Sequence, residues 1–398
     1  MSQYQVLVVG GGNAGISISA YLKNNQPNLK IAIIDPSEKH YYQPAWTLVG
    51  GGAFNAKDTE KNQKDYIPKG VTWIKQKCTS FQPEDNQVTL GDGTTVAYDY
   101  LVVCPGIQLD WGAVKGLKEN LGKNGVCSNY SFQIAPYTFE CIKNLKGGNA
   151  VFTNPHTPVK CGGAPHKIMY LAADYFRKHG NLDKVNIEYW SGAGRLFSVD
   201  KYEKTLLEVV KKGNIDLNFN FKLLEIDGAN KKAIFEGFGE NNKGDIREVS
   251  FDMTHVTPPQ SAPDFIKNSP LANSAGWVDV NINTLQHNTY SNIFSLGDVA
   301  GLPISKTGAA IRKQMPVAAK NLLALIEQKS LDNHYNGYTS CPLVTGYGKL
   351  VLAEFDYNNQ PQESFPIDQS KERWSMYQLK KQVLPRLYWG RILKGKMA

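Results

Sequence analysis

YQVLVVGGGNAGISISAYLKNNQPNLKIAIID, residues 4–35, is the stretch that decides the fold of this chain. Its first apolar run, residues 5–9, is short and rich in Val, which is typical of a buried parallel strand. A helical pattern follows the glycines, and a second apolar run, residues 30–34, ends at an acid. Strand, glycine loop, helix and strand in this order predict a βαβ unit.

The glycine loop of this unit has the spacing of a dinucleotide-binding motif. The three spaced glycines would provide a tight turn, close backbone approach to a pyrophosphate and close helix–strand packing, with the phosphates at the helix N-terminus. Asp35 lies 20 residues beyond Gly15, where a carboxylate can accept hydrogen bonds from a ribose. The alternative is a glycine turn that holds no ligand. The residues predicted to bind the dinucleotide here are Gly10, Gly12, Asn13, Ala14, Gly15 and Asp35.

The composition favours a globular α/β protein of two or three domains. The chain has 398 residues, of which 41% are hydrophobic and 36 are glycines. Its net charge of +8 is concentrated in residues 371–398, which hold eight Lys or Arg and one acid. A basic end of this kind fits an anionic surface, and we expect no nucleic-acid partner and no metal site.

The cysteines and apolar runs limit where the protein can reside. Six cysteines scattered over this length do not resemble a secreted disulfide framework. No uncharged apolar run approaches the roughly 18 residues of a spanning helix. Because the first strand begins at about residue 4, we expect no signal or transit peptide within the chain. The prediction is a protein that is soluble or lies on a membrane surface.

A second βαβ unit is predicted in the middle of the chain, with strands at residues 150–153 and 185–190 and a helix at 166–179. A nicotinamide-binding unit needs closely spaced glycines directly after its first strand. Here residues 154–158 are Asn, Pro, His, Thr and Pro. The βαβ architecture is therefore repeated, but the second unit lacks the glycines of a dinucleotide site. Its loop contains Cys161.

The chain is then predicted to return to the first domain. A strand at residues 292–296 leads to Asp298, and a helix follows at 307–328. An acid after a buried strand that faces a helix N-terminus can hold a ribityl hydroxyl. The predicted domains are residues 1–110 with 280–335, residues 111–279, and a C-terminal region of residues 336–398.

These motifs together resemble the two-dinucleotide-domain flavoprotein superfamily. Within it the chain is similar to the sulfide:quinone oxidoreductase family, in the subtype shared with mitochondria, over nearly its whole length. The supporting segments are YQPAWTLVG at 42–50, TPVKC at 157–161, HVTPP at 255–259, AGWVDV at 275–280, GYTSCPLV at 337–344 and DQSKER at 368–373. The resemblance implies an α/β fold of two tandem, glutathione-reductase-like Rossmann domains with a C-terminal membrane-associated helical segment.

The resemblance also implies FAD as cofactor and a redox-active pair, Cys161 and Cys341, beside it. A disulfide is the natural electrophile for hydrosulfide, and attack leaves a persulfide on one sulfur and frees the other as a thiolate. By resemblance, Cys341 carries the persulfide and Cys161 is the thiolate that adds to the flavin C4a carbon. Lys160 and a following helix N-terminus would lower the pKa of Cys161. The further cofactor-binding residues expected are Gln43, Cys78, Gly106, Asp298 and Lys306.

The remaining cysteines are expected to have no part in the chemistry. Cys78, Cys104 and Cys141 are predicted to be inert core residues, although Cys78 is also counted in the cofactor-binding set. Cys127 lies where a three-cysteine subtype of the family has its extra cysteine, whereas the mitochondrial-like subtype lacks one. We interpret Cys127 as non-essential, because every other segment matches the two-cysteine subtype.

The basic C-terminal region mixes aromatic and aliphatic residues with Lys and Arg. Two helices separated at Pro385 are predicted there, lying in the headgroup layer of a membrane. The alternative is an amphipathic cover for the core. A quinone, ubiquinone or menaquinone, would enter between these helices and the flavin, with Phe355, Tyr377 and Lys380 as candidate pocket residues.

The resulting prediction is a sulfide:quinone oxidoreductase that passes sulfane sulfur to glutathione, sulfite or cyanide. It is expected at the inner face of the cytoplasmic membrane, or at the mitochondrial inner membrane if a transit peptide precedes the chain, and a homodimer is left open. The alternatives are an NADH:quinone oxidoreductase of the same superfamily and a non-catalytic flavin-binding scaffold. Reduction of the flavin by NADH alone, or turnover that does not need Cys161, would favour one of these alternatives.

Overall fold

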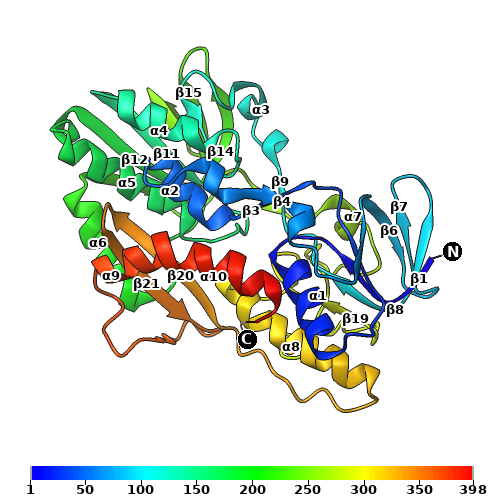
Figure 1. Ribbon diagram of the computed structural model, residues 1–398. Helices are drawn as coiled ribbons and strands as arrows, with labels where there is room; N and C mark the ends of the chain where they lie inside the picture. The colour runs from blue at the N-terminus through cyan, green and yellow to red at the C-terminus, as the bar shows by residue number, and fades with distance from the viewer. Residues whose placement is uncertain (1, 397–398) are drawn as a thin grey trace.

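The computed structural model describes residues 2–396 and shows two sheet-centred domains, with a C-terminal hairpin and helix packed beside them (Figure 1). The first sheet has the strand order β5–β2–β1–β8–β7–β6, and β19 pairs with β8 on a branch. Its strands are β1 Ser2–Val9, β2 Ile31–Ile34, β5 Val71–Ile74, β6 Cys78–Gln82, β7 Gln87–Leu90, β8 Thr95–Val103 and β19 Ile293–Ser295.

The predicted βαβ unit forms the centre of this sheet. β1 and β2 pair in parallel with Val6 opposite Ile31, and helix α1, Asn13–Asn25, connects them. Residues 6–9 and 31–34 are buried, which explains why both strands read as continuous apolar runs. The fold class predicted from the sequence is confirmed.

Strand β19 completes the first sheet from a distant part of the chain. It pairs in parallel with β8, with Ile293 opposite Leu101. Because β1, β2, β8 and β19 are all parallel, the loops that follow them open at the same edge. Gly10, Asp35 and Asp298 are therefore brought to one edge although they are far apart in sequence.

The second sheet is parallel throughout, in the order β10–β17–β11–β12–β13, and a three-stranded sheet, β14–β15–β16, lies beside it. Helix α5 follows β11 and contains the expected Pro165 in its first turn. The elements of this domain are α3 Leu117–Asn120, β10 Val126–Cys127, α4 Ala135–Asn144, β11 Gly148–Asn154, α5 Ala164–Lys178, β12 Val185–Ser191, α6 Asp200–Lys212, β13 Ile215–Phe219, β14 Phe221–Asp227, β15 Lys232–Gly237, β16 Ile246–Ser250 and β17 Met253–His255.

Short elements connect the two domains. Strand β18, Gln260–Ser261, pairs with β9, Gln108–Leu109, and the following Ile266 and Leu271 pack in the core of the first sheet. The chain is thus back at the first domain before residue 279. The remaining short elements are β3 Lys39–Tyr41, α2 Trp46–Gly50, β4 Glu60–Asn62 and α7 Asp264–Lys267.

One expected strand is two strands in the structure. The sequence of residues 71–81 predicts one continuous strand, whereas β5 and β6 lie at opposite ends of the first sheet. Residues 75–77 between them are Lys, Gln and Lys, and the chain leaves the sheet at these polar residues. The strand propensity of the flanking residues hides this break, because β5 and β6 are separated by only three residues.

The C-terminal region comprises a hairpin and a bent helix. The hairpin strands β20, Thr339–Gly346, and β21, Lys349–Phe355, pack against α5 and share the second core. Helix α8, Gly308–Ile326, precedes them. The helices α9, Trp374–Gln378, and α10, Leu384–Gly390, are joined by a π-helical turn, Leu379–Val383 (Figure 1, red).

The expected separation of two helices at Pro385 is therefore wrong. Pro385 stands in the first turn of α10 and follows directly on the π turn. Proline lacks the N–H that an uninterrupted α-helix would use at this position, and the helix takes the wider π geometry in the turn before it. Within residues 2–396, we find no helix with the length and apolarity to cross a bilayer.

Candidate functional site

A cavity of about 1220 Å³ opens at the carboxyl edge of the first sheet and reaches the second domain, the hairpin and helix α10. This volume suits a large ligand with room for a second one. The predicted site residues that line it are Gly10, Gly12, Asn13, Ala14, Asp35, Gln43, Gly106, Cys161, Asp298, Lys306 and Lys380. Among the described residues, Gly15, Cys78, Cys341, Phe355 and Tyr377 lie outside this lining.

The glycine loop is shaped for close approach of a ligand to the backbone. Gly10 has a φ of +107°, which favours glycine, and a Cβ on Gly15 would lie 1.8 Å from the Gly10 carbonyl oxygen. A Cβ on Gly12 would meet nothing within 4 Å, since it would point into the open cavity. Gly15 therefore serves helix–strand packing, whereas Gly12 leaves room for the ligand.

Asp35 fixes the geometry of the loop from the end of β2. Its Oδ2 accepts a hydrogen bond from the Gly11 backbone N–H at 2.5 Å, and its Oδ1 accepts one from Ser37 N–H at 2.7 Å. Burial raises the pKa of the Asp35 carboxyl, and the two backbone hydrogen bonds partly offset this rise. The carboxyl lines the cavity and can accept further hydrogen bonds there.

Three charged groups face one another at the opposite part of the cavity. Burial raises the pKa of Asp298, and the charges of Lys306 and Lys160 work against this rise. Burial lowers the pKa of each lysine to about 8, although the negative charge of Asp298 acts in the opposite direction. Lys306 Nζ donates to the Ala300 carbonyl at 3.2 Å and lies 3.9 Å from the centre of the Trp277 ring. The cluster provides both donors and an acceptor for a polar ligand.

The two predicted catalytic cysteines come from different domains and meet. Cys161 lies just before α5, and Cys341 is on β20, which packs against α5. The thiol of Cys341 is within hydrogen-bonding reach of the Cys161 sulfur. Cys341 is buried directly behind the cavity wall that its neighbours Ser340 and Pro342 form. Their meeting was expected from the resemblance and could not be read from spacing.

The surroundings of the pair make the two sulfurs unequal. The hydrogen bond from Cys341 and the nearby ammonium of Lys167, whose Nζ lies 2.9 Å from the Cys161 sulfur, hold the pKa of Cys161 well below its usual value. The pKa of Cys341 is raised, chiefly by its hydrogen bond to Cys161 and by burial. Cys161 is thus the thiolate of the pair and Cys341 the thiol.

The cation beside Cys161 is not the one that the sequence suggested. Lys160, next to it in sequence, donates to Gln43 Oε1 at 2.6 Å. Lys167 was missed because it stands six residues after Cys161, on a helix predicted to begin at residue 166 that begins at Ala164. Lys380 is a second cation near the pair, since the charges of both cysteines act on it. Burial lowers the pKa of Lys380 to about 7.

The structure separates the three candidate quinone residues. Lys380 lines the cavity and donates to the Pro44 carbonyl at 3.1 Å. Phe355 packs on Phe197 with ring centres 5.8 Å apart, away from the cavity lining, and Tyr377 also lies outside it. The apolar residues that do line this end, and that sequence reasoning missed, are Pro316, Val317, Pro342, Leu352, Phe365, Leu379, Leu384 and Leu387.

Cys78 lies away from the predicted cofactor site. It is on β6, and its thiol is 3.7 Å from the Ser80 carbonyl. Cys104 does line the cavity, where its thiol is 3.6 Å from the Gly10 carbonyl. Of these two cysteines Cys104 lies at the cavity, because it directly follows β8, whose end faces the cavity.

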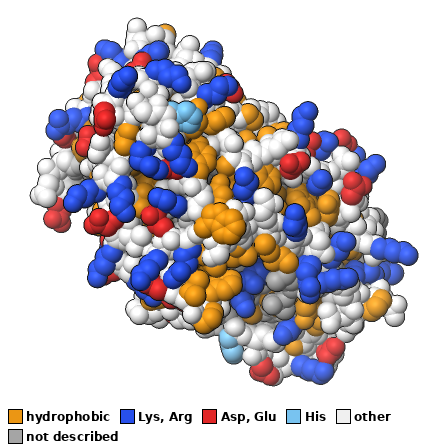
Figure 2. All heavy atoms as spheres, turned by 60° about the vertical axis from the view of Figure 1, so that its left-hand side comes forward, with side chains coloured by type: hydrophobic (Ala, Val, Ile, Leu, Met, Phe, Trp, Pro, Cys, Tyr) orange, Lys and Arg blue, Asp and Glu red, His pale blue; other side chains and the backbone are white. Residues whose placement is uncertain are grey.

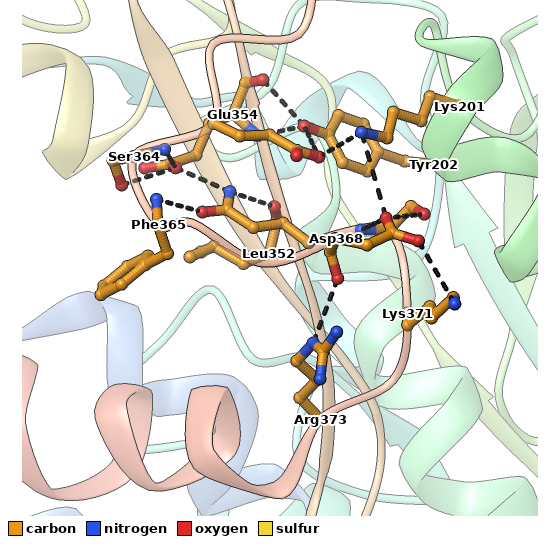
Figure 3. A network of polar contacts seen from close by, with 12 residues as sticks. Lys201, Tyr202, Leu352, Glu354, Ser364, Phe365, Asp368, Lys371 and Arg373 are labelled. Atoms are coloured by element: carbon orange, nitrogen blue, oxygen red, sulfur yellow. Dashed lines mark hydrogen bonds and ion pairs between the residues drawn. The ribbon is translucent and has the colours of Figure 1, made fainter.

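A buried carboxylate closes the far wall of the cavity. Glu354 accepts hydrogen bonds from the Tyr338 hydroxyl and from Gln369 Nε2 at 2.7 Å. Figure 3 shows its hydrogen bonds with Ser364, whose backbone N–H and hydroxyl donate at 2.8 and 2.7 Å. The Tyr202 hydroxyl, from α6, donates to its backbone carbonyl at 3.0 Å. This network ties the segment that carries Phe365 to the hairpin and to the second domain.

One face of the molecule carries hydrophobic side chains along its middle, with Lys and Arg on both sides (Figure 2). The C-terminal region supplies three of the large hydrophobic side chains that are exposed. Trp374 is 67% exposed, Val383 40% and Phe365 39%. Aromatic and aliphatic side chains exposed beside cations are typical of a surface that binds at a membrane interface.

Comparison with known proteins places the chain in a family. Residues 4–134 match the pyridine nucleotide-disulphide oxidoreductase family. The chain is 51% identical to the mitochondrial sulfide:quinone oxidoreductase of Dictyostelium discoideum, covering 98% of this chain and 86% of that protein. It is 43% identical to the mitochondrial sulfide:quinone oxidoreductase of Mus musculus, with coverages of 99% and 87%.

A solved structure agrees with the fold. The chain superposes on the sulfide:quinone oxidoreductase of Aquifex aeolicus with a TM-score of 0.83 at 23% identity, covering 99% of this chain and 92% of that one. The resemblance stated from the sequence motifs is confirmed by the identity to the two mitochondrial relatives. The chain belongs to the sulfide:quinone oxidoreductase family.

Proposed function

We propose that this protein oxidises hydrogen sulfide with Cys161, Cys341 and FAD, and passes the electrons to a membrane quinone. The observation that carries the proposal is the contact of the two cysteine sulfurs beside Lys167 at the wall of the cavity. A thiolate and a thiol in contact are the two ends of a disulfide after it has accepted two electrons. Family membership adds the sulfide and quinone chemistry.

The cavity residues fit FAD. Family membership implies a flavin-type cofactor, and the open space above Gly12 suits a pyrophosphate at the N-terminus of α1. Asp35 would hold the ribose of the adenosine part, and Asp298 a ribityl hydroxyl. Gln43, Gly106 and Lys306 would complete the contacts, since all three line the cavity. Bound FAD would supply an acceptor for two electrons next to the sulfur of Cys161.

The protein's own residues account for the sulfur step. Hydrosulfide attacks the Cys341 sulfur of a Cys161–Cys341 disulfide, so that an S–S bond forms on Cys341 and the bond to Cys161 breaks. Cys341 then carries a persulfide and Cys161 leaves as a thiolate. Lys167 stabilises that thiolate, which makes Cys161 the better leaving group. Cys341, whose sulfur is attacked, is buried, which limits competition by water.

The outer sulfur of the persulfide leaves with a small nucleophile: glutathione, sulfite or cyanide. Lys160, Lys167 and Lys380 line the cavity and suit an anionic acceptor. Transfer returns Cys341 to the thiolate level, and Cys161 and Cys341 can then re-form their disulfide, for which bound FAD would accept the two electrons. The cations thus serve both sulfide entry and acceptor binding.

The quinone, ubiquinone or menaquinone, would occupy the apolar end of the cavity beside helix α10. Its tail would leave between α10 and the exposed hydrophobic residues of the C-terminal region, which would rest on the membrane. This arrangement makes the protein peripheral, at the inner face of the cytoplasmic membrane or at the mitochondrial inner membrane.

Anaerobic titration of the purified protein with sulfide, followed by the flavin absorbance, tests the proposal. Sulfide is expected to bleach the flavin, and added quinone to restore it. Cys161→Ser and Cys341→Ser are each expected to abolish sulfide-dependent quinone reduction, whereas Cys141→Ser, which changes a cysteine on α4 outside the cavity lining, keeps it. Full turnover by either variant of the pair contradicts the assignment.

The same titration with NADH tests the alternative enzyme. The loop after β11 folds back so that a Cβ on Gly192 would lie 2.4 Å from the His156 backbone nitrogen. The segment thus packs tightly where a nicotinamide-binding unit would need open backbone. We expect no bleaching of the flavin by NADH. A flavin that is bleached by NADH but not by sulfide favours an NADH:quinone oxidoreductase. A flavin that neither donor bleaches favours a non-catalytic scaffold.

A further inference from the structure

A second pair of cysteines lies in the second domain, outside the lining of the cavity. Cys127 is on β10 and Cys141 on α4, and both belong to one hydrophobic cluster in which Cys141 packs against the buried Cys127. The thiol of Cys127 is within hydrogen-bonding reach of the Cys141 sulfur. The Tyr137 hydroxyl accepts a hydrogen bond from the Gly125 N–H at 3.1 Å and holds α4 over the start of β10.

The two thiols differ as an attacking and a resolving thiol do. Cys141 is partly exposed, and hydrogen bonds from Cys127 and Tyr137 lower its pKa. Cys127 is fully buried, its thiol is 3.4 Å from the Thr254 carbonyl, and burial raises its pKa. A reagent in solution therefore meets Cys141 first, and Cys127 is the neighbour that can attack what forms there.

We propose that Cys127 and Cys141 are a second dithiol, which a hydropersulfide oxidises to a disulfide. The Cys141 thiolate attacks the outer sulfur of the hydropersulfide RSSH, forms a Cys141 persulfide and releases the thiol RSH. The Cys127 thiol then attacks the Cys141 sulfur, which forms the Cys127–Cys141 bond and expels H2S. In sum, two thiols and RSSH give one disulfide, RSH and H2S, so the cysteines lose two electrons and the sulfane sulfur gains them.

The source of this oxidant rests on the proposed function, since a hydropersulfide is what transfer of sulfane sulfur to a thiol acceptor would release. Asn129 and Tyr130, which lie between the two cysteines in sequence, line the cavity. A disulfide would close the loop that carries them. The oxidation state of the Cys127–Cys141 pair would thus depend on the level of sulfane sulfur that this enzyme releases. Thiols in a reducing compartment would reduce the disulfide back to the dithiol.

Peptide mapping tests the proposal directly. Cleavage after Lys and Arg gives one peptide, residues 124–143, that contains both cysteines of the pair. It also gives a matched control peptide, residues 78–115, with Cys78 and Cys104, whose thiols face the backbone carbonyls of Ser80 and Gly10. The holoenzyme is treated with glutathione hydropersulfide, alkylated and digested.

In peptide 124–143 both cysteines are expected to escape alkylation, and the peptide mass is expected to be lower by two hydrogens. Dithiothreitol is expected to reverse this change. Both cysteines of peptide 78–115 are expected to be alkylated. The Cys161→Ser holoenzyme is expected to give the same result, so the test does not depend on the proposed turnover. Peptide 124–143 that stays fully alkylated, or a disulfide that forms only when Cys161 is present, overturns the proposal.

Two variants test the order of events. Cys127→Ser is expected to stop at a persulfide, so that peptide 124–143 gains one sulfur at Cys141. Cys141→Ser is expected to leave Cys127 unmodified, because the buried thiol is not reached first. A persulfide on Cys127 in the Cys141→Ser variant contradicts the assigned roles.

Discussion

At the scale of single residues, the sulfur chemistry depends on the charge of Lys167. The hydrogen bond from Cys341 is the main cause of the lowered pKa of Cys161, and the ammonium of Lys167, 2.9 Å from the Cys161 sulfur, lowers this pKa further, ahead of the charge of Lys380. An opposite charge this close shifts a pKa by roughly 1–3 units. The side chain reaches the sulfur from the first turns of α5, so it is held by the helix and not by the loop.

Lys167→Met is expected to raise the pKa of Cys161, so that less thiolate is present at neutral pH. The acid limb of the pH profile of kcat, which reports the enzyme forms after sulfide has opened the disulfide and freed the Cys161 thiol, then moves to higher pH by about one unit or more. Steady-state quinone reduction measured across pH checks this. Lys167→Arg keeps the positive charge and should keep the profile near that of the wild type. An unmoved acid limb in Lys167→Met contradicts the role given to this charge.

Two glycines of one motif are expected to respond differently to alanine. A methyl group on Gly15 would overlap the Gly10 carbonyl, so Gly15→Ala should destabilise the apoprotein by more than the roughly 1–3 kcal/mol usual for overpacking. Gly12→Ala has open space and should leave the melting temperature of the apoprotein unchanged while the protein loses FAD. Thermal unfolding and the flavin content after purification separate the two effects. Equal behaviour of both variants is the contrary result.

Cys127 provides a test of the cysteine subtype. Cys127→Ser is expected to retain sulfide-dependent quinone reduction, because its side chain is buried outside the cavity lining. Near-complete loss of activity, with the flavin content and melting temperature preserved, would place Cys127 among the catalytic cysteines instead.

At the scale of elements, local patterns predicted much of the structure. The strand, glycine loop and helix at the N-terminus were predicted because each residue there satisfies a local rule, and residues 13–25 form the expected helix. The contact of Lys167 with Cys161 could not be predicted, since it needs the exact start of α5. Glu354 was missed for a similar reason, because its donors come from four places along the chain.

The C-terminal helix has an outer and an inner side with different expected roles. Trp374 is 67% exposed, whereas Tyr388 of α10 is buried and its hydroxyl is 2.6 Å from His40 Nε2. Leu384, Leu387 and Tyr388 on the inner side line the cavity, so α10 is part of the cavity wall as well as a cover. Removal of the whole region would therefore disturb the site together with the surface.

Point variants separate these two roles. Trp374→Ser is expected to weaken flotation with anionic liposomes while the stability is unchanged, because the ring is exposed. Tyr388→Ala is expected to lower the free energy of unfolding by about 3–5 kcal/mol, since a large buried ring is removed. Flotation assays and urea unfolding measure the two effects. Undiminished flotation of Trp374→Ser, and of a chain truncated after Ile367, would remove the membrane role of this region.

At the scale of the whole molecule, Glu354 joins parts that are distant in sequence. Its carboxylate accepts hydrogen bonds from Tyr338, Gln369 and Ser364, and its backbone carbonyl accepts one from Tyr202 of α6. Figure 3 shows the bonds with Ser364 and Tyr202. Each buried donor left without a partner costs about 1–3 kcal/mol. The network therefore holds the hairpin, the cavity wall and the second domain in one arrangement.

Glu354→Ala is expected to destabilise the protein by at least about 2 kcal/mol, because several buried donors lose their acceptor together. It should also weaken the binding of quinone, since Phe365 and Ser364 line the cavity. Urea unfolding and the KM for quinone test both effects. Asp183→Ala, on an exposed turn, serves as the control. A stability equal to that of the control would mean that the network adds nothing.

The pairing of β19 with β8 has a consequence for biosynthesis. Residues 293–295 complete a sheet whose first strand begins at residue 2, and Asp298 and Lys306 of the cavity follow them. Domains tend to fold as units while the chain emerges from the ribosome. About three quarters of this polypeptide must be translated before the N-terminal half of the site can close around its prosthetic group. Flavin binding is thus expected late in synthesis, because the glycine loop is complete as a site only after β19 has been translated and has paired with β8.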